Sequence, residues 1–281
     1  MSVAHTVPVL MYHHVSPSPG AITCTPEHFE DQLRWLAERG YRSLTSDEFA
    51  GHLQGKAVPS KSVLITFDDG YLNNWVYAHP LLKKYGFNAM LFVVTSWVHD
   101  GVVRPHAGQV GVPATPDHHT CQRLINEGQS DQVILRWSEL QKMQEEGTFE
   151  IHSHTHTHTR WDKSDRAAEK NALMAEELAQ SRAALLQNMG AVSEHFCWPQ
   201  GYFDDDYVRV AQDAGFKYLY TTKAFGQNRK GTDPAHIYRF AVRNTTGASV
   251  GRRIRVAANP VIAPVFNRWK LWKRSLRERA S

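Results

Sequence analysis

Short apolar runs alternate along most of the chain with longer segments in which apolar residues recur every three or four positions. Uninterrupted apolar runs are typical of strands buried on both faces, and the longer spacing is typical of amphipathic helices. Seven strands are predicted, over residues 7–12, 62–67, 88–94, 149–151, 195–198, 218–222 and 237–242. Because helical segments separate most of these strands, we expect parallel strands, in a barrel or in a doubly wound sheet.

Capping residues mark the ends of several predicted helices. Thr25 and Pro26 are typical of a helix start, as N-cap and first helical residue. Ser138 and Gln141 have the spacing of a capping box. The remaining helix predictions are a helix that stops at Gly86, one from Ser138 to about Gly147, one over 164–189 closed by Gly190, and one over 204–214.

The residues after the first strand distinguish a barrel from a nucleotide-binding sheet. A dinucleotide fold carries a glycine-rich loop of the form G-x-G-x-x-G at this point, whereas here His13 and His14 follow. Other residues suited to chemistry also follow strands, namely Asp68, Asp69 and Pro199. Active sites of α/β barrels gather at the carboxyl ends of the strands, so the pattern favours an α/β barrel.

Two segments depart from the alternation of strands and helices. Residues 99–131 are rich in Gly, Pro and His and are predicted to form an irregular lid or binding loop. Residues 252–281 hold nine Lys/Arg and one acid, a net charge of +8, whereas the other 251 residues sum to −4. We therefore predict one barrel domain over residues 1–251, followed by a basic helical tail over 252–281.

The tail has the pattern of a helix that lies on a membrane surface. One predicted face carries Val265, Trp269, Trp272 and Leu276, and the opposite side carries Lys270, Lys273, Arg274 and Arg277. Tryptophan on an apolar face with Lys/Arg on the polar face is typical of peripheral membrane helices. This pattern predicts membrane contact through residues 265–279. The alternative is a helix packed on the barrel, whose basic side is merely solvated.

Composition and charge narrow the possible partners and locations. The mildly acidic body argues against a nucleic-acid partner. No run of eighteen apolar residues is present, and the first fifteen residues lack the basic and apolar regions of a secretory signal. The three cysteines are far apart and form no C-x-x-C pair, which disfavours a disulfide framework. We expect a cytoplasmic protein that contacts the inner face of a membrane.

Two adjacent carboxylates, Asp68 and Asp69, end the second predicted strand in the segment TFDDG (66–70). Neighbouring side chains at a strand end point in different directions, so one can bind a cation while the other takes a proton. The alternative interpretation is a simple turn, because Asp-Gly is a common turn pair.

A second candidate is the histidine cluster HSHTHTH (152–158). In a strand all four histidines would share one face, whereas in a turn leading into a helix either His152 with His156 or His154 with His158 would do so. A spacing of four is common among histidine metal ligands. The alternative is an exposed histidine-rich loop. Two histidines and one aspartate would leave positions open for water and substrate, as a catalytic zinc site requires.

Three segments in this order resemble a known family. ITFDDG (65–70), HSHTHTH (152–158) and FCWPQG (196–201) are similar to the first three motifs of the polysaccharide deacetylases, the NodB-homology group or carbohydrate esterase family four. VLMYHHV (9–15) resembles the Tyr-His element of the poly-N-acetylglucosamine deacetylase branch. The resemblance extends from residue 7 to about 245 and implies a distorted (β/α)7 barrel.

The first two motifs of the family imply roles for four residues. The first motif supplies a general base and a metal ligand, which correspond to Asp68 and Asp69. The second has the form His-Ser/Thr-x-x-His and corresponds to His154 and His158, as metal ligands. The other two histidines of the cluster are then expected outside the metal site.

The third motif departs from the family pattern, which is often Arg-x-Pro-Tyr-Gly. Pro199 and Gly201 match, but Cys197 stands in the place of the arginine and Gln200 in the place of the aromatic residue. The family's arginine orients the general base. Arg239, on a later strand, is the candidate to replace it.

The resemblance also implies a general acid and an oxyanion donor. In the branch with the Tyr-His element, the acid corresponds to His13, with His14 as the adjacent alternative. Asp68 would take a proton from the attacking water, and the backbone N–H of Gln200 would stabilise the developing oxyanion. Candidate sugar-stacking walls are Trp137, Trp198, Tyr202 and the 99–131 loop, each of which could instead be a packing residue.

These residues lead to one expected function. The sequence predicts a metal-dependent N-deacetylase acting on an N-acetylated amino sugar, in a surface polysaccharide or in its lipid-linked precursor. The expected cofactor is one divalent metal, zinc first, with cobalt or nickel as alternatives. The competing functions are an amidase acting on a non-sugar amide and a glycan-binding module that has lost activity.

Overall fold

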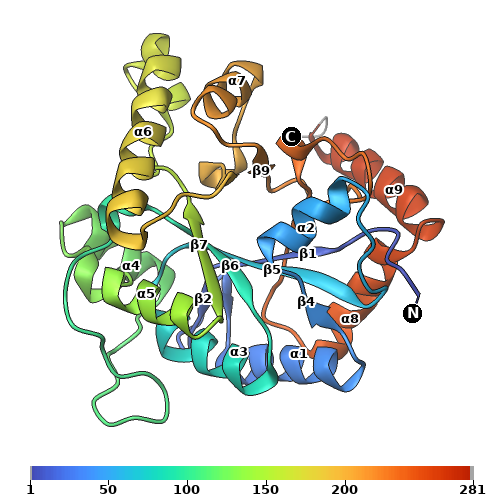
Figure 1. Cartoon of the computed structure of the whole chain (residues 1–281), viewed down its shortest axis with the longest axis horizontal. Coiled ribbons are helices and arrows are strands. Elements are labelled where there is room, and N and C mark those ends of the chain that lie inside the picture. Colours follow the sequence, from blue (N-terminus) through green and yellow to red (C-terminus); the bar gives the residue numbers. More distant parts are fainter. Residues whose placement is uncertain (1, 279–281) are drawn as a thin grey trace.

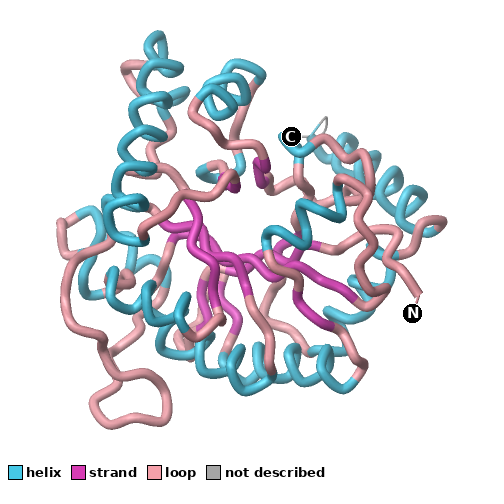
Figure 2. Tube along the Cα trace, in the orientation of Figure 1, coloured by secondary structure: helices cyan, strands magenta, loops and turns pink. Residues whose placement is uncertain are grey.

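The computed structural model describes residues 2–278 of the chain. At its centre lies a curled sheet of parallel strands surrounded by helices (Figures 1 and 2). The strands follow the order β10-β1-β5-β6-β7-β8-β9. Their bounds are Val9–Tyr12 (β1), Ser62–Asp69 (β5), Ala89–Val93 (β6), Phe149–Ser153 (β7), His195–Cys197 (β8), Tyr218–Tyr220 (β9) and Phe240–Ala241 (β10).

The two edges of this sheet meet, so that the strands enclose a distorted barrel. Tyr220 of β9 forms a parallel bridge with Ile237, three residues before β10, and β10 pairs in turn with β1. The predicted single-domain (β/α)7 barrel is therefore confirmed. Outside the ring, β4 (Arg42–Ser43) pairs with the start of β5, and β2 (His14–Val15) pairs with β3 (Thr23–Cys24).

Helices join and cover the strands. The α-helices are α1 (Pro26–Glu38), α2 (Ser46–Leu53), α3 (His79–Tyr85), α4 (His118–Asn126), α5 (Trp137–Glu145), α6 (Lys170–Met189), α7 (Asp205–Asp213), α8 (Gly247–Ala258) and α9 (Ile262–Glu278). A π-helical turn, η1 (Asn74–Ala78), precedes α3, and the 3₁₀ turns are η2 (Thr95–Trp97), η3 (Ser130–Gln132), η4 (Trp161–Lys163), η5 (Ala167–Glu169), η6 (Pro199–Gly201) and η7 (Pro234–His236). The predicted boundary at residue 251 lies inside α8.

Local capping signals were right at some helices and wrong at another. The Thr25 hydroxyl accepts the His28 N–H at the start of α1, as predicted. The predicted capping box of Ser138 is wrong, because α5 begins one residue earlier and Glu139 accepts the backbone N–H of Arg136 instead. The long helix α6 begins at Lys170 rather than at 164, after two 3₁₀ turns, and ends at a left-handed Gly190.

The insertion at 99–131 is not irregular throughout, contrary to the prediction. It contains α4, whose first turn is capped by the Asp117 side chain. Its earlier part is held to the barrel by Arg104, which forms a buried bidentate ion pair with Glu139 of α5. The insertion is therefore fixed against the barrel, and α4 can present side chains at a defined place.

Buried apolar side chains of the strands belong to three clusters. Val9, Leu64 and Met90 belong to a cluster that also includes residues of β8 and β9, as expected for side chains inside a closed sheet. Leu10 and Ile65 belong to a second cluster, together with residues of α1 and α5. Phe196 of β8 and Leu219 of β9 belong to a third, with residues of α6 and α7. Among residues 2–278, no helix is both long enough and apolar enough to cross a membrane.

Candidate active site

A pocket of about 200 Å³ opens at the carboxyl ends of the strands. Its walls combine the end of β5 and the residues after β1, β7, β8 and β9 with the residue before β3 and the insertion helix α4. It is lined by His13, Ile22, Asp68, Asp69, His118, Gln122, His154, His158, Trp198, Gln200, Gly201 and Thr222. Most of the residues singled out in the sequence therefore share one pocket.

Asp69, His154 and His158 form the first group in this pocket. Asp69 Oδ1 lies 3.4 Å from His154 Nε2 and 3.7 Å from His158 Nε2. Ligands about 2.0–2.2 Å from a tetrahedral ion are themselves separated by about 3.3–3.6 Å, so these three atoms fit one divalent metal. The Asp69 carboxyl is ionised, because the His154 hydrogen bond and the nearby His158 outweigh burial and hold its pKa well below the usual range.

The ring of His154 is oriented by the neighbouring strand. Its Nδ1 lies 2.8 Å from the carbonyl oxygen of Cys197 in β8 and donates to it. This hydrogen bond leaves Nε2 for the Asp69 side of the pocket. A ligating histidine that donates its other ring nitrogen to a carbonyl is the usual arrangement at protein metal sites, which supports the same assignment.

Unusual backbone conformations concentrate at this site. Asp69, Thr155, His158 and Gln200 are the non-glycine residues with positive φ in the described part of the chain, at 76°, 70°, 64° and 53°. Each such residue costs of order 1–3 kcal/mol. The positive φ values of Thr155 and His158 turn the backbone so that the rings of His154 and His158 come together, with centroids 4.9 Å apart. The helix considered for this segment in the sequence does not form.

Asp68 belongs to a second, fully buried group. Both its oxygens accept from Arg239, at 2.7 Å from Nη1 and 2.8 Å from Nη2. Burial works to raise the pKa of Asp68, but Arg239 outweighs it, so the pKa lies below its ordinary value. Arg239 Nη2 also lies 3.0 Å from Cys197 Sγ. The small thiol thus leaves room for a guanidinium that arrives from the segment before β10.

His13 and His14 lie in different environments. His13 Nε2 is 3.8 Å from Asp68 Oδ2, and about a fifth of its side chain is exposed in the pocket. His14 is fully buried, and burial with the nearby His118 lowers its pKa to about 3. A histidine that stays neutral cannot act as the general acid at neutral pH, which favours His13 over His14 for that role.

The third motif contributes Trp198, Gln200 and Gly201 to the pocket wall. Gly201 has a φ of 69°, and a Cβ there would lie 2.1 Å from Thr222 Oγ1, so this position requires glycine. Gln200 is exposed beside it, and Pro199 is buried behind it. Trp198 borders the pocket, but its indole is fully buried, stacked on Phe203 and Tyr207.

Two of the three candidate aromatic residues are packing residues, the alternative left open by the sequence. Trp198 and Trp137 are buried core residues and cannot stack on a sugar. Tyr202 is half-buried beneath Arg160, whose guanidinium carbon lies 4.0 Å from the ring centroid. Trp97 was not identified in the sequence, yet its half-buried ring lies 5.5 Å from that of His158.

The other two histidines of the cluster lie away from the metal-ligand group. His152 is buried, with Nδ1 2.6 Å from Ser193 Oγ. His156 is half-buried, with Nδ1 2.9 Å from Thr95 Oγ1. Sequence reasoning also missed His118 and Gln122 of α4, because only the tertiary fold brings the insertion to the strand ends.

Known proteins share this sequence pattern and fold. Residues 55–219 match the family profile described as polysaccharide deacetylase. The chain is 26% identical over 193 residues to the poly-β-1,6-N-acetyl-D-glucosamine N-deacetylase of Staphylococcus aureus, covering 68% of this chain and 58% of that protein. It is 44% identical over 89 residues to YxkH of Bacillus subtilis, covering 31% of this chain and 32% of that protein. These matches therefore span about a third to three fifths of the relatives.

Two solved structures resemble the whole barrel. IcaB from Ammonifex degensii superposes with a TM-score of 0.70 at 25% identity, over 88% of this chain and 96% of that one. The Streptococcus pyogenes deacetylase PplD, solved with acetate, gives a TM-score of 0.70 at 19% identity, over 92% of this chain and 100% of that one. The second likeness concerns the fold alone.

Proposed function

Because the chain belongs to the polysaccharide deacetylase family, we propose that it is a metal-dependent N-deacetylase acting on an N-acetylated amino sugar, in a surface polysaccharide or its lipid-linked precursor. The observation that carries this proposal is the side-by-side arrangement of two ionised aspartates. Asp69 faces two histidines, whereas Asp68 is bound by Arg239 and faces His13. One carboxylate can thus hold a metal while its neighbour handles protons.

The residues of the chain divide the reaction among themselves. Asp68 accepts a proton from the attacking water, and Arg239 holds that carboxylate in place through two hydrogen bonds. His13 donates a proton to the leaving amine, which is a poor leaving group until it is protonated. The backbone N–H of Gln200 is the proposed donor to the oxyanion. A divalent metal held by the Asp69 group would polarise the acetyl carbonyl and lower the pKa of water.

Zinc is the proposed metal. Two imidazoles and one carboxylate are a frequent catalytic zinc donor set, and they leave positions open for water and substrate. Cobalt and nickel accept the same donors and are the alternatives.

Acetate release from N-acetylglucosamine oligomers by the zinc-loaded protein tests this function. We expect release that a chelator abolishes and added zinc restores. Hydrolysis of simple acetyl amides without activity on any N-acetylated sugar would instead favour the non-sugar amidase. Glycan binding without metal-dependent turnover of sugars or activated acetyl esters would favour the inactive binding module.

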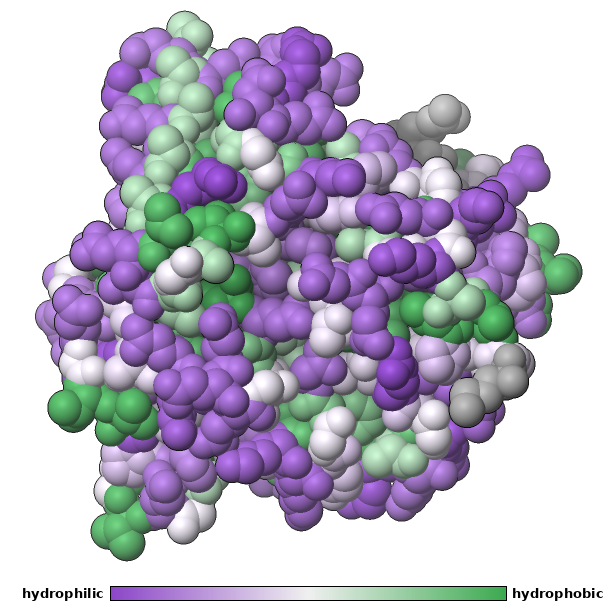
Figure 3. All heavy atoms as spheres, viewed as in Figure 1, coloured by the Kyte–Doolittle hydropathy of each residue, from purple (hydrophilic) through white to green (hydrophobic). Residues whose placement is uncertain are grey.

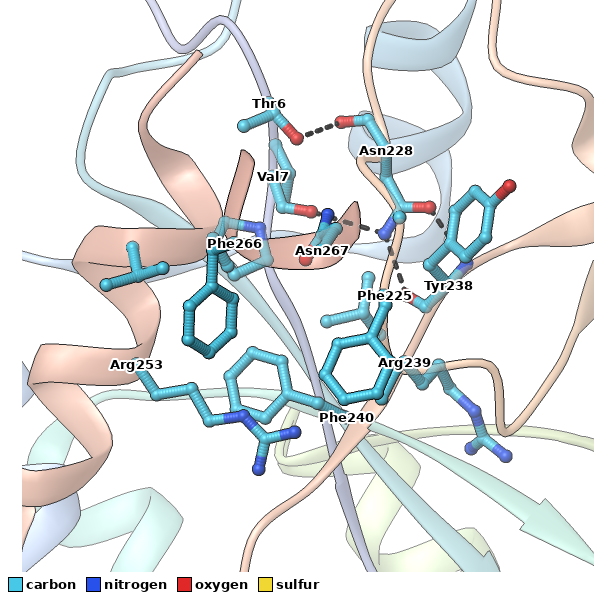
Figure 4. A pocket seen from close by; sticks show the side chains of 16 residues that line it. Thr6, Val7, Phe225, Asn228, Tyr238, Arg239, Phe240, Arg253, Phe266 and Asn267 are labelled. Atoms are coloured by element: carbon cyan, nitrogen blue, oxygen red, sulfur yellow. Dashed lines mark hydrogen bonds between the residues drawn. The ribbon is translucent and has the colours of Figure 1, made fainter. Parts of the chain in front are cut away.

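We also propose that α9 contacts the surface of a membrane. The side of α9 that carries Ala263 and Phe266 packs on the barrel, where Phe266 points into a small cavity beside Phe225, Phe240 and Arg253 (Figure 4). Large apolar residues remain exposed on other sides of the helix and just before it. Their exposed fractions are 76% for Val261, 52% for Ile262, 70% for Val265, 43% for Trp269, 57% for Trp272 and 44% for Leu276.

This exposed stripe supports a membrane as the occupant because of the charge around it. The stripe at 265, 269, 272 and 276 follows helical spacing and lies away from the packed side. Figure 3 shows hydrophobic atoms at the edge of the molecule where α8 and α9 lie. Residues 252–281 carry a net charge of +8, which favours anionic headgroups by about 1 kcal/mol per Lys/Arg near the surface.

Co-sedimentation with vesicles tests the membrane contact. We expect binding to anionic vesicles at low salt and little binding to neutral ones, whereas equal recovery in the supernatant with both would contradict it. The three cysteines are free and buried, which supports the proposed cytoplasmic location at the inner face of the membrane. The predicted contact segment ends at residue 279, which lies outside the described residues.

A further inference from the structure

The insertion contributes a histidine to the pocket through the first turn of α4. His118 is the first residue of this helix and lines the pocket together with Gln122, one turn later. His118 Nδ1 faces the buried residues His14 and Tyr71, 3.1 Å from His14 Nε2 and 3.4 Å from the Tyr71 hydroxyl. Within residues 2–278, no hydrogen bond is formed by its other ring nitrogen, Nε2.

A chain of hydrogen bonds determines which ring nitrogens carry the protons, and it begins at Asn73. The Asn73 side-chain oxygen accepts from the Val15 backbone N–H at 3.3 Å and from Asn74 Nδ2 at 3.2 Å. These two donors fix the orientation of the amide. Its Nδ2 therefore faces His14 Nδ1, at 2.8 Å, and donates to it.

The proton position on His14 determines the proton position on His118. Because His14 Nδ1 accepts from Asn73, a neutral His14 carries its proton on Nε2. Burial keeps His14 neutral by lowering its pKa to about 3, and its ring is stacked on Tyr71 at a centroid distance of 3.8 Å. The Nε2–H of His14 then donates to His118 Nδ1. A neutral His118 consequently carries its own proton on Nε2, as a donor without a protein partner.

We propose that His118 is a substrate-binding residue that donates this Nε2–H to a sugar oxygen beside the acetamido group. The inference rests on the proposed deacetylase function. His118 and His13 line the same pocket. His13 is the proposed donor to the leaving nitrogen, which is bonded to the sugar, so a further donor in this pocket can meet a sugar oxygen near that nitrogen.

The direction of donation along these hydrogen bonds, from Asn73 to His118, can be measured without any substrate. In the zinc-loaded full-length protein, ¹⁵N NMR of the histidine rings should show the Nε2–H tautomer for both His14 and His118. Asn73→Asp replaces the amide donor with an acceptor, so both rings should convert to the Nδ1–H tautomer. A His118 that carries its proton on Nδ1 in the native protein would overturn the inference.

Kinetics test the contact with the sugar. His118→Phe keeps a ring but removes the donor, and should lower kcat/KM for N-acetylglucosamine oligomers about 10–100-fold, the usual cost of an unpaired buried hydrogen-bonding group. Hydrolysis of 4-nitrophenyl acetate, which has no sugar hydroxyl, should stay near the native rate. His118→Gln, which can still donate, should recover part of the loss, and Asn73→Asp should resemble His118→Phe.

His119 provides a matched control for His118. His119 is exposed, follows His118 directly and does not line the pocket, so His119→Phe should be neutral on both substrates. Equal losses on the oligomer and the ester would assign His118 a structural role and reject the contact. A native protein that hydrolyses the ester but no N-acetylated sugar would refute the proposed function, and the sugar contact with it, while the NMR result would still decide the proton arrangement.

Discussion

The carboxyl end of the barrel and helix α9 depart from the usual distribution of residues in opposite ways. At the strand ends, ionisable side chains are buried, and Asp68 and Arg239 are almost inaccessible to solvent. On α9, large apolar side chains such as Val265 and Trp269 are exposed. Soluble domains normally bury apolar groups and expose charged ones, so neither arrangement is explained by folding alone.

The two regions differ in whether the chain itself supplies partners for the unusual residues. Buried charges are costly unless they are paired, and the charges at the strand ends have partners within the chain: Arg239 for Asp68, and two histidines for Asp69. The stripe on α9 faces solvent, since the opposite side of the helix is the one that packs on the barrel. The charges at the strand ends are therefore paired within the chain, whereas the stripe on α9 remains available to an external surface.

Removing a metal ligand should have the largest effect on the strand-end site. His154→Ala should abolish stoichiometric zinc binding and lower deacetylation by at least about a thousandfold, because it removes one of three donors. Metal content by mass spectrometry and acetate release measure both. His156 lies two residues further along the chain and contacts Thr95 instead, so His156→Ala should leave metal binding and activity unchanged. Loss of zinc from His156→Ala instead would show that the ligand pair is His152 and His156.

The pairing of buried charges can be broken at Arg239. Arg239→Met should destabilise the protein by about 3–5 kcal/mol, because it leaves the Asp68 carboxylate buried without its partner. Urea unfolding measures this change. Adding Asp68→Asn to Arg239→Met should recover a substantial part of the stability but no activity, since the proton acceptor is then missing. An Arg239→Met variant as stable as the native protein would contradict the argument.

The general-acid role should produce a smaller and substrate-dependent effect. His13→Ala should lower hydrolysis of the amide about 100-fold or more, and that of an aryl acetate much less, because a phenolate leaves without a proton. The ratio of the two rates in steady-state assays is the measurement. Equal losses on both substrates would reject the assignment, and a selective loss only in His14→Ala would move the role by one residue.

The sequence predicted what depends on local pattern and on motif order. The strand ends that carry Asp68 and Asp69 follow from an apolar run, and the start of α1 follows from Thr25. The bidentate pair of Asp68 with Arg239 joins residues 171 positions apart, so the sequence could only suggest it as a candidate. Likewise, the chain of hydrogen bonds to His118 depends on how the insertion packs on the barrel.

Tertiary contacts decide the outcome at Ser138 and at Trp198. The box assigned to Ser138 failed because its hydroxyl donates to the Gly101 carbonyl of the insertion, a contact that local spacing cannot reveal. Trp198 was a candidate either for a sugar-stacking wall or for a packing residue, and its indole packs in an aromatic cluster with Phe203 and Tyr207. At both positions a tertiary neighbour, which local spacing cannot reveal, supplies the partner.

The membrane contact of α9 should give the smallest effects, and two leucines allow a matched test. Leu276 and Leu271 are exposed to similar extents, 44% and 50%, but only Leu276 lies on the stripe with Val265 and Trp269. Leu276→Ser should therefore weaken binding to anionic vesicles about fivefold, as expected for roughly 1 kcal/mol of lost apolar burial. Leu271→Ser should bind like the native protein.

Salt separates the apolar part of this contact from the electrostatic part. Raising the ionic strength from 0.01 to about 0.15 M shortens the screening length from about 30 to 8 Å, and should weaken binding of the native protein and of both leucine variants by the same factor. The ratio between Leu276→Ser and Leu271→Ser should then persist at high salt, because burial of a leucine side chain is not screened. If both substitutions weaken binding equally at every salt concentration, the stripe has no defined orientation on the membrane. The exposed face of α9 would then be better explained by a protein partner.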